Sequence, residues 1–140
     1  MADAAPAPVM KREDVAGRSS RRLAFPSSRR LLAHALFQRV FAEGREAPGR
    51  FLVVWVSRAP DAGRRLGVVA TKRTFHDAVD RNRAKRLIRE SFRRIQHDFT
   101  DEPWELVVLA RRRILEVKQP QVQDELSKLC ARQGILRGSR

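Results

Sequence analysis

Hydrophobic and polar positions recur along the chain with two different periods, which predict helices and strands. Within the segment SSRRLLAHALFQRVFAEG, the apolar positions follow a helical spacing. Gly44 closes this segment and is a typical helix stop. We therefore predict a first helix here, with its apolar positions at Leu36, Phe37, Val40 and Phe41.

Short apolar runs predict the strands. FLVVWV at 51–56 is rich in β-branched and aromatic residues, and the turn-forming cluster SRAPDAG follows it. RRLGVVATK at 64–72 predicts a second strand, which we expect to pair antiparallel with the first. WELVVLA at 104–110 predicts a third, and Leu23–Phe25 is a candidate for an additional short edge strand.

Two further helices complete the pattern. One is expected from about Asp80 to Phe99, and the last from about Pro120 to Gln133, with Gly134 as its stop. The order is helix, strand, strand, helix, strand, helix, which predicts an α+β sandwich with helices packed on one small sheet.

The ends of the chain differ from its middle. Residues 1–22 are rich in Ala, Pro, Gly, Ser and charge without periodicity, so we expect a disordered N-terminal tail. The remaining length fits a single domain over 23–136, with a flexible C-terminal tail at 137–140.

The helix beginning near Asp80 carries an unusual charge pattern. On a helical wheel one arc is apolar and packs on the sheet; it contains Ala84, Leu87, Ile88, Phe92 and Ile95. Beside it a row of basic residues repeats at i, i+4, flanked by Asn82 and Arg86; the row consists of Arg81, Lys85, Arg89 and Arg93. A solvated helix face usually alternates signs, because like charges at this spacing lose about 0.2–0.5 kcal/mol per pair. Glu90 is the only acid between Asp80 and Asp98, so the row indicates a binding surface.

The composition suggests what that surface binds. The net charge is +14, and Arg outnumbers Lys 25 to 5. A GC-rich genome explains part of the Arg excess but not the net charge. Arg matches phosphate oxygens in pairs, and the i, i+4 row spaces its charges by about 6 Å. Nucleic acid is therefore the leading partner, although spacing alone does not separate RNA from DNA.

Other classes of function lack their residues. Cys130 stands alone, so neither a disulfide framework within the chain nor a Cys-based zinc site is expected. No apolar run is long enough to cross a bilayer, and the N-terminus lacks the apolar stretch of a signal peptide, so we expect a cytoplasmic protein with no membrane partner. The acids do not cluster as a catalytic or metal site borne by the protein would require.

At this point the residues carry a family resemblance. RLGVVATKRTFHDAVDRNRAKRLIRESFRR resembles the signature of the protein subunit of bacterial ribonuclease P, through RNR at 81–83, the following KRLIRESFR and the strand with Gly67. FQRVF at 37–41 is similar to that family's first helix, LAFP at 23–26 to one branch of it, and WELVVLARR to its last strand. The likeness covers roughly Arg22 to Leu136.

The resemblance implies a fold and a task. The fold would be a small mixed β-sheet packed with about three helices in the order α-β-β-β-α-β-α, with a left-handed βαβ crossover. The task would be to assist a catalytic RNA, which holds the active-site Mg²⁺ and removes the 5′ leader of precursor tRNA. The protein would then be one subunit of an endoribonuclease, a monomer in a 1:1 ribonucleoprotein complex, with no catalytic residue of its own and no metal ligand that the sequence identifies.

The resemblance also implies two binding sets. The set facing the ribonuclease P RNA would be Arg81, Asn82, Arg83, Lys85, Arg86 and Arg89. The cleft for the precursor-tRNA leader would be formed by Phe37, Phe41, Trp55, Lys72, Arg73 and Arg111. On spacing alone the Phe pair is a core pair and Trp55 is equally compatible with core and cleft; the resemblance favours a partly exposed stacking surface, where each base gains about 1–3 kcal/mol.

The sequence departs from the family pattern in one loop, and two other functions are to be weighed against the resemblance. The loop KRTFHDAV has Phe75 and His76 where many family members have Gly, which leaves its leader contacts open. A structural RNA-binding protein, such as a small ribosomal protein, would share the charge and size but would not need an aromatic cleft. A DNA-binding protein is disfavoured, because the basic helix also packs along one face and no helix-turn-helix partner is evident.

Overall fold

The computed structural model describes residues 34–58 and 64–137. The predicted tail at 1–22, residues 138–140 of the predicted tail at 137–140 and the candidate edge strand Leu23–Phe25 lie outside the described residues. Arg137 is described, and its N–H donates to the Asp98 carbonyl at 2.7 Å. The described elements, in chain order, are α1 (His34–Glu43), β1 (Arg45–Pro48), β2 (Leu52–Ser57), β3 (Arg65–Val69), α2 (Ala78–Ile95), the 3₁₀ helix η3 (Gln96–Asp98), β4 (Glu105–Ala110), the 3₁₀ helix η4 (Arg112–Glu116) and α3 (Gln119–Arg132).

The helix boundaries follow from local chemistry. A Cβ on Gly44 would lie 2.5 Å from the Val40 carbonyl oxygen, so the close turn that ends α1 requires glycine. Pro120 lies in the first turn of α3, where its missing N–H costs nothing. Gly134 has φ +79°, the left-handed conformation that commonly follows a helix, and its N–H donates to the Ala131 carbonyl at 3.0 Å.

The sheet has the order β1-β2-β4-β3. β2 pairs antiparallel with both β1 and β4, whereas β3 pairs parallel with β4. The expected antiparallel pairing of 64–72 with 51–56 is therefore wrong. The physical reason is that both edges of β2 are occupied, by β4 and by a strand at 45–48 whose sequence, REAP, shows no hydrophobic alternation.

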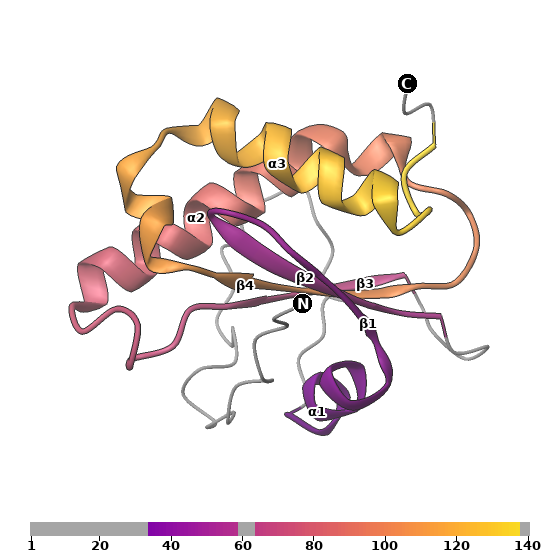
Figure 1. Ribbon diagram of the computed structural model, residues 1–140, viewed down its shortest axis with the longest axis horizontal. Coiled ribbons are helices and arrows are strands. Elements are labelled where there is room, and N and C mark those ends of the chain that lie inside the picture. Colours follow the sequence, from indigo (N-terminus) through magenta and orange to yellow (C-terminus); the bar gives the residue numbers. More distant parts are fainter. Residues whose placement is uncertain (1–33, 59–63, 138–140) are drawn as a thin grey trace.

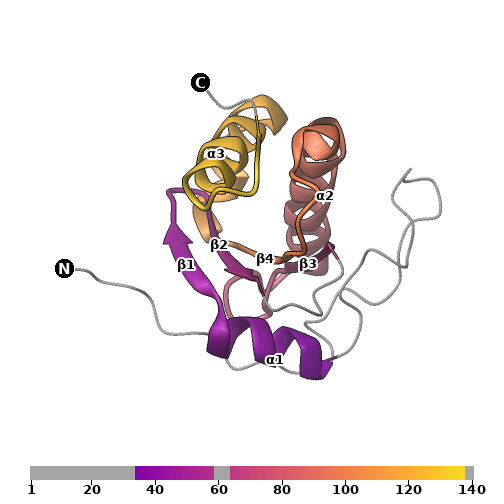
Figure 2. The ribbon, with the colours of Figure 1, turned by 90° about the vertical axis from the view of Figure 1, so that its right-hand side faces the viewer.

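The connection from β3 through α2 to β4 is left-handed. Both strands run from right to left in Figure 1, with α2 on the upper side of the sheet. In Figure 2 the same strands run away from the viewer, and β4 lies to the left of β3. Seen from the helix side, the chain thus moves left as it crosses over. This is the rare hand for a βαβ unit, and it confirms the fold that the family resemblance implied.

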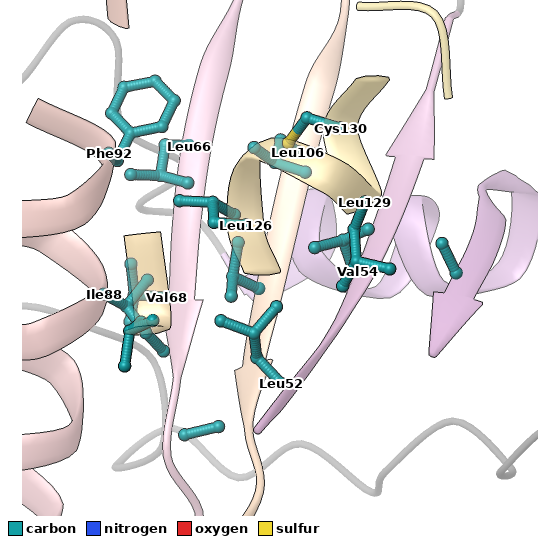
Figure 3. Close-up of a cluster of buried hydrophobic side chains, with 14 of the residues drawn as sticks. Leu52, Val54, Leu66, Val68, Ile88, Phe92, Leu106, Leu126, Leu129 and Cys130 are labelled. Carbon is teal, nitrogen blue, oxygen red and sulfur yellow. The ribbon is translucent and has the colours of Figure 1, made fainter. Parts of the chain in front are cut away.

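Helices cover both faces of the sheet, as Figure 2 shows. α2 and α3 cover one face, where they enclose the larger core; Figure 3 shows Val54, Leu66, Ile88 and Leu126 meeting there from two strands and two helices. α1 covers the other face over a smaller core, which consists of Phe37, Val40, Phe41, Val53, Trp55, Val69 and Val107. The predicted α+β class with three helices is confirmed.

One side chain fixes the β1–β2 turn on α3. The Glu125 carboxylate accepts hydrogen bonds from three consecutive backbone N–H groups, those of Arg50 (3.0 Å), Phe51 (2.7 Å) and Leu52 (3.1 Å). A Cβ on Gly49 would collide with the same carboxylate, so a side chain there would have to displace the Glu125 carboxylate from its hydrogen bonds. These hydrogen bonds hold the β1–β2 turn against α3.

Candidate nucleic-acid interface

One face of the basic helix α2 packs in the core, and the other lies on the surface of the protein. Its buried positions are Ala84, Ile88, Ser91, Phe92 and Ile95. Leu87, which the helical pattern placed in this arc, is half-buried and packs against the same core. Because the apolar arc is committed to the sheet and to α3, the basic residues lie on the remaining surface of α2.

The six residues expected to face RNA all lie on α2, within three turns. Asn82, Arg83 and Arg86 are exposed, while Arg81, Lys85 and Arg89 are half-buried. The Arg81 guanidinium has an additional structural role, because its Nη1 donates to the backbone carbonyls of Phe75 (2.9 Å) and His76 (3.4 Å). Arg81 therefore links the basic helix to the loop that precedes it, which sequence reasoning did not anticipate.

The two halves of α2 differ in charge compensation. In the C-terminal half, the Glu90 carboxylate binds Arg93 (2.6 Å) and Arg94 (2.9 Å). The hydrogen bond from Arg93 is the largest cause that holds the pKa of Glu90 below its ordinary value; burial opposes it, and the hydrogen bond from Arg94 adds to the lowering. From Arg81 to Arg89 the helix contains no acid. The stretch of α2 from Arg81 to Arg89 thus carries charges of one sign, whereas the C-terminal half carries both signs.

A second basic group lies where two strands end. Lys72 and Arg73 follow β3, and Arg111 follows β4; all three are exposed. Because β3 and β4 are parallel, with Val69 in register with Leu109, these residues leave the sheet at the same end. The structure therefore brings together the three basic residues of the predicted leader set.

The loop between β3 and α2 is anchored to the core. Phe75 is completely buried in the larger core, and its N–H donates to the Thr71 carbonyl at 2.9 Å. Arg112 Nη1 donates to the Thr74 carbonyl at 3.1 Å. The departure from the family pattern at Phe75 therefore supplies a core side chain, and the exposed His76 follows it.

The aromatic members of the leader set are more buried than the resemblance suggested. Phe37 is 0% exposed, Phe41 8% and Trp55 3%. Phe41 and Trp55 contact each other edge to face, with ring centroids 4.8 Å apart. The physical reason is that α1 lies directly on this face of the sheet, so its i, i+4 Phe pair points into the smaller core. The expected partly exposed stacking surface is not seen in these three side chains.

A buried charge that sequence reasoning missed lies on the same face of the sheet. Glu105, the first residue of β4, is 0% exposed. Its carboxylate binds the guanidinium of Arg39 from α1 at 2.5 Å and that of Arg65 from β3 at 3.4 Å. These partners are 66 and 40 residues away in the sequence, so no local pattern indicates them.

The described ranges 34–58 and 64–137 hold neither a metal-binding cluster nor a membrane-spanning helix. No group of three or more His, Cys, Asp or Glu residues is placed to hold a metal ion there. No helix in these ranges is long and apolar enough to cross a membrane. Cys130 is completely buried, as expected of a small core residue, and burial raises the pKa of its thiol.

Comparisons with known proteins place the sequence in one family of RNA-processing proteins. Residues 25–134 match the family model described as Ribonuclease P. The ribonuclease P protein component of Cronobacter sakazakii is 38% identical over 120 residues, covering 84% of this chain and 98% of the relative. That of Pseudomonas aeruginosa is 36% identical over 109 residues, covering 77% of this chain and 79% of the relative.

Two solved structures of RNase P proteins have a fold similar to that of this chain. The Staphylococcus aureus RNase P protein superposes with a TM-score of 0.68 at 26% identity, covering 78% of this chain and 98% of that one. The Thermotoga maritima RNase P protein gives a TM-score of 0.64 at 28% identity, covering 74% and 96%.

Proposed function

Since the chain belongs to the ribonuclease P protein family, we propose that it acts as the protein component of ribonuclease P in tRNA 5′ maturation. Ribonuclease P is an endoribonuclease whose RNA subunit is catalytic, so the protein's task is to bind and position RNA. The observation that carries the proposal is the one-signed face of α2 between Arg81 and Arg89.

The RNA-facing set acts by matching phosphates. Successive turns of α2 place basic groups about 5–6 Å apart along the helix axis. Exposed guanidinium groups such as those of Arg83 and Arg86 donate to phosphate oxygens in pairs, and Asn82 can bond both donors and acceptors on sugars and bases. Because the opposite face of α2 is packed, the helix presents this surface without rearrangement. Its partner in the proposal is the ribonuclease P RNA.

The leader of precursor tRNA is proposed to follow the second basic group. Lys72, Arg73 and Arg111 contact its phosphates at the shared end of β3 and β4. The packed layer of Phe37, Phe41 and Trp55 supports α1 beside this path and contacts the leader only at its edges, in keeping with the burial of these rings.

Mg²⁺ belongs to the RNA subunit in this proposal. The part of the chain that the structure describes offers no cluster of acids fitted to the ion. The residues of this protein neutralise phosphates and orient the substrate, while a metal ion held by the RNA would supply the activation of water. We further propose a cytoplasmic 1:1 complex of a protein monomer with the RNA.

An exposed aromatic cleft would distinguish a ribonuclease P protein from a purely structural RNA-binding protein. Since Phe37, Phe41 and Trp55 are buried, that criterion does not separate the two functions. The family membership favours ribonuclease P instead, and no feature of the described residues favours a ribosomal role over it.

Reconstitution tests the proposal. The purified protein is mixed with ribonuclease P RNA at low Mg²⁺, where cleavage of precursor tRNA by the RNA alone is slow. We expect the wild-type protein to stimulate cleavage and the triple variant R81A/R83A/R86A to stimulate it less. A control variant, K128A/R132A/R137A, removes the same charge from exposed positions on and after α3. No stimulation by the wild-type protein would refute the function, and equal losses in the two variants would refute the role of α2.

A further inference from the structure

Among the described residues, helix α1 contacts the sheet through the smaller core and through an ion pair whose carboxylate is buried. It contacts β2 and β4 through Phe37, Val40 and Phe41. The polar attachment joins Arg39 of α1 to Glu105 of β4, at 2.5 Å between Nη2 and Oε1. Among the described residues the smaller core comprises seven buried side chains, and the ion pair adds a directional polar link between α1 and the sheet.

The Glu105 carboxylate joins three elements at one point. It begins β4, binds α1 through Arg39 and binds β3 through Arg65 at 3.4 Å. Side chains alternate along a strand, so Glu105 lies on the same face as Val107, which belongs to the smaller core. A completely buried carboxylate is costly unless its charge is matched, and here two half-exposed guanidinium groups match it.

A buried ion pair can fix the orientation of the elements it joins as well as contribute to stability. Replacing a buried ion pair with well-packed apolar side chains is often neutral or stabilising, whereas directional ion pairs can specify one arrangement of the elements they join. The element joined here is α1, whose Phe41 makes the edge-to-face contact with Trp55 at 4.8 Å. That contact requires a defined orientation of the helix on the sheet.

We propose that Glu105 is a positioning residue for the leader of precursor tRNA: through Arg39 it fixes where α1 lies on the sheet, and so shapes the path beside Phe37, Phe41 and Trp55. This inference rests on the leader binding proposed above. It assigns Glu105 no contact with RNA, because the carboxylate is completely buried and would repel phosphates.

The test compares two neutralised acids in the reconstituted holoenzyme. Glu105→Gln removes the buried charge with little change of shape. Glu102→Gln is the matched control, since it removes the same charge three residues earlier from an exposed pair with Arg58 at 3.3 Å. Dissociation constants are measured for precursor tRNA, for mature tRNA and for the ribonuclease P RNA. Thermal unfolding of each protein shows how much of it is folded at the assay temperature.

The expected result is selective. Glu105→Gln should weaken binding of precursor tRNA by about fivefold, equivalent to about 1 kcal/mol or the stacking of one base, while affinity for mature tRNA and for the RNA subunit is retained. Glu102→Gln should change none of the three. A loss of overall folding would lower every affinity alike, so equal losses for precursor and mature tRNA would overturn the inference.

A second variant covers the case in which Glu105→Gln does not fold. Arg39→Met leaves Glu105 paired with Arg65 and removes only its ion pair with α1, and Arg39→Lys restores the charge without the planar fork. We expect the selective loss in Arg39→Met and its partial recovery in Arg39→Lys. Wild-type protein that does not favour precursor over mature tRNA would refute leader binding itself. A wild-type preference that persists in Glu105→Gln and Arg39→Met would refute only the role of Glu105.

Discussion

The charge pattern of α2 leads to a quantitative prediction about salt. Arg83 and Arg86 are both exposed, in the stretch of α2 from Arg81 to Arg89 that contains no acid. Changing both to Ala removes two guanidinium groups without opening a cavity, since neither lies in the core. If both contact phosphates of the ribonuclease P RNA, the double variant loses two of the counterion-releasing contacts that make binding salt-dependent.

The magnitude follows from counterion release. Each phosphate contact contributes about 0.7–0.9 to the slope of log K against log salt, so two lost contacts lower the slope by about 1.4–1.8. Between about 50 and 200 mM salt, the Kd ratio of variant to wild type should then shrink by about sevenfold to twelvefold. The variant is thus impaired most at low salt.

The assay is a titration of labelled ribonuclease P RNA with protein at several salt concentrations. R93A/R94A is the matched control, because it removes two Arg residues from the same helix that already bind Glu90. We expect this control to change the slope of log K against log salt by less than the about 0.7–0.9 that one phosphate contact contributes. An unchanged slope in R83A/R86A would show that the N-terminal half of α2 faces solvent in the complex. Equal losses of slope in the two variants would show that the RNA contacts are not concentrated in that half.

Three further outcomes are expected. Phe37→Ala should lower the free energy of unfolding by about 3–5 kcal/mol, because Phe37 is completely buried; a loss below about 1 kcal/mol in urea titrations would contradict its place in the core. Since Arg93 and Arg94 lower the pKa of folded Glu90, wild type should be more stable than Glu90→Gln above the ordinary pKa of 4.5, and the difference should vanish as pH falls through the lowered pKa; a pH-independent difference would contradict this. Burial raises the pKa of the Cys130 thiol, so a thiol reagent should modify it only as fast as the protein opens, and rapid modification of the native protein would argue against its burial.

Segments with strong periodicity were predictable from the sequence. The helix expected from Asp80 to Phe99 is α2 at Ala78–Ile95 followed by a 3₁₀ turn, and the strand expected at 104–110 is β4 at Glu105–Ala110. These succeed because the apolar spacing of each segment matches the face it buries. The basic face of α2 was predictable for the same reason, as the complement of a well-defined apolar arc.

The features that the sequence did not predict depend on contacts between distant segments of the chain. The strand at 45–48 is an edge strand, where backbone pairing with β2 outweighs its polar sequence. The partner of β3 is set by which edges of the sheet are occupied, which no local pattern shows. The Glu105 pairs join residues far apart in sequence, and the burial of Trp55 depends on where α1 lies.

The central claim is that the N-terminal half of α2 docks the catalytic RNA, and site-directed cleavage tests it most directly. A single cysteine introduced by Arg83→Cys carries an iron chelate that generates hydroxyl radicals, while the native Cys130 is buried and stays unmodified. A second protein carries the chelate through Lys128→Cys on α3, where Lys128 is exposed. The account predicts localised cuts in the ribonuclease P RNA from position 83 and few or none from position 128. The reverse pattern, or equal cutting from both positions, would contradict it.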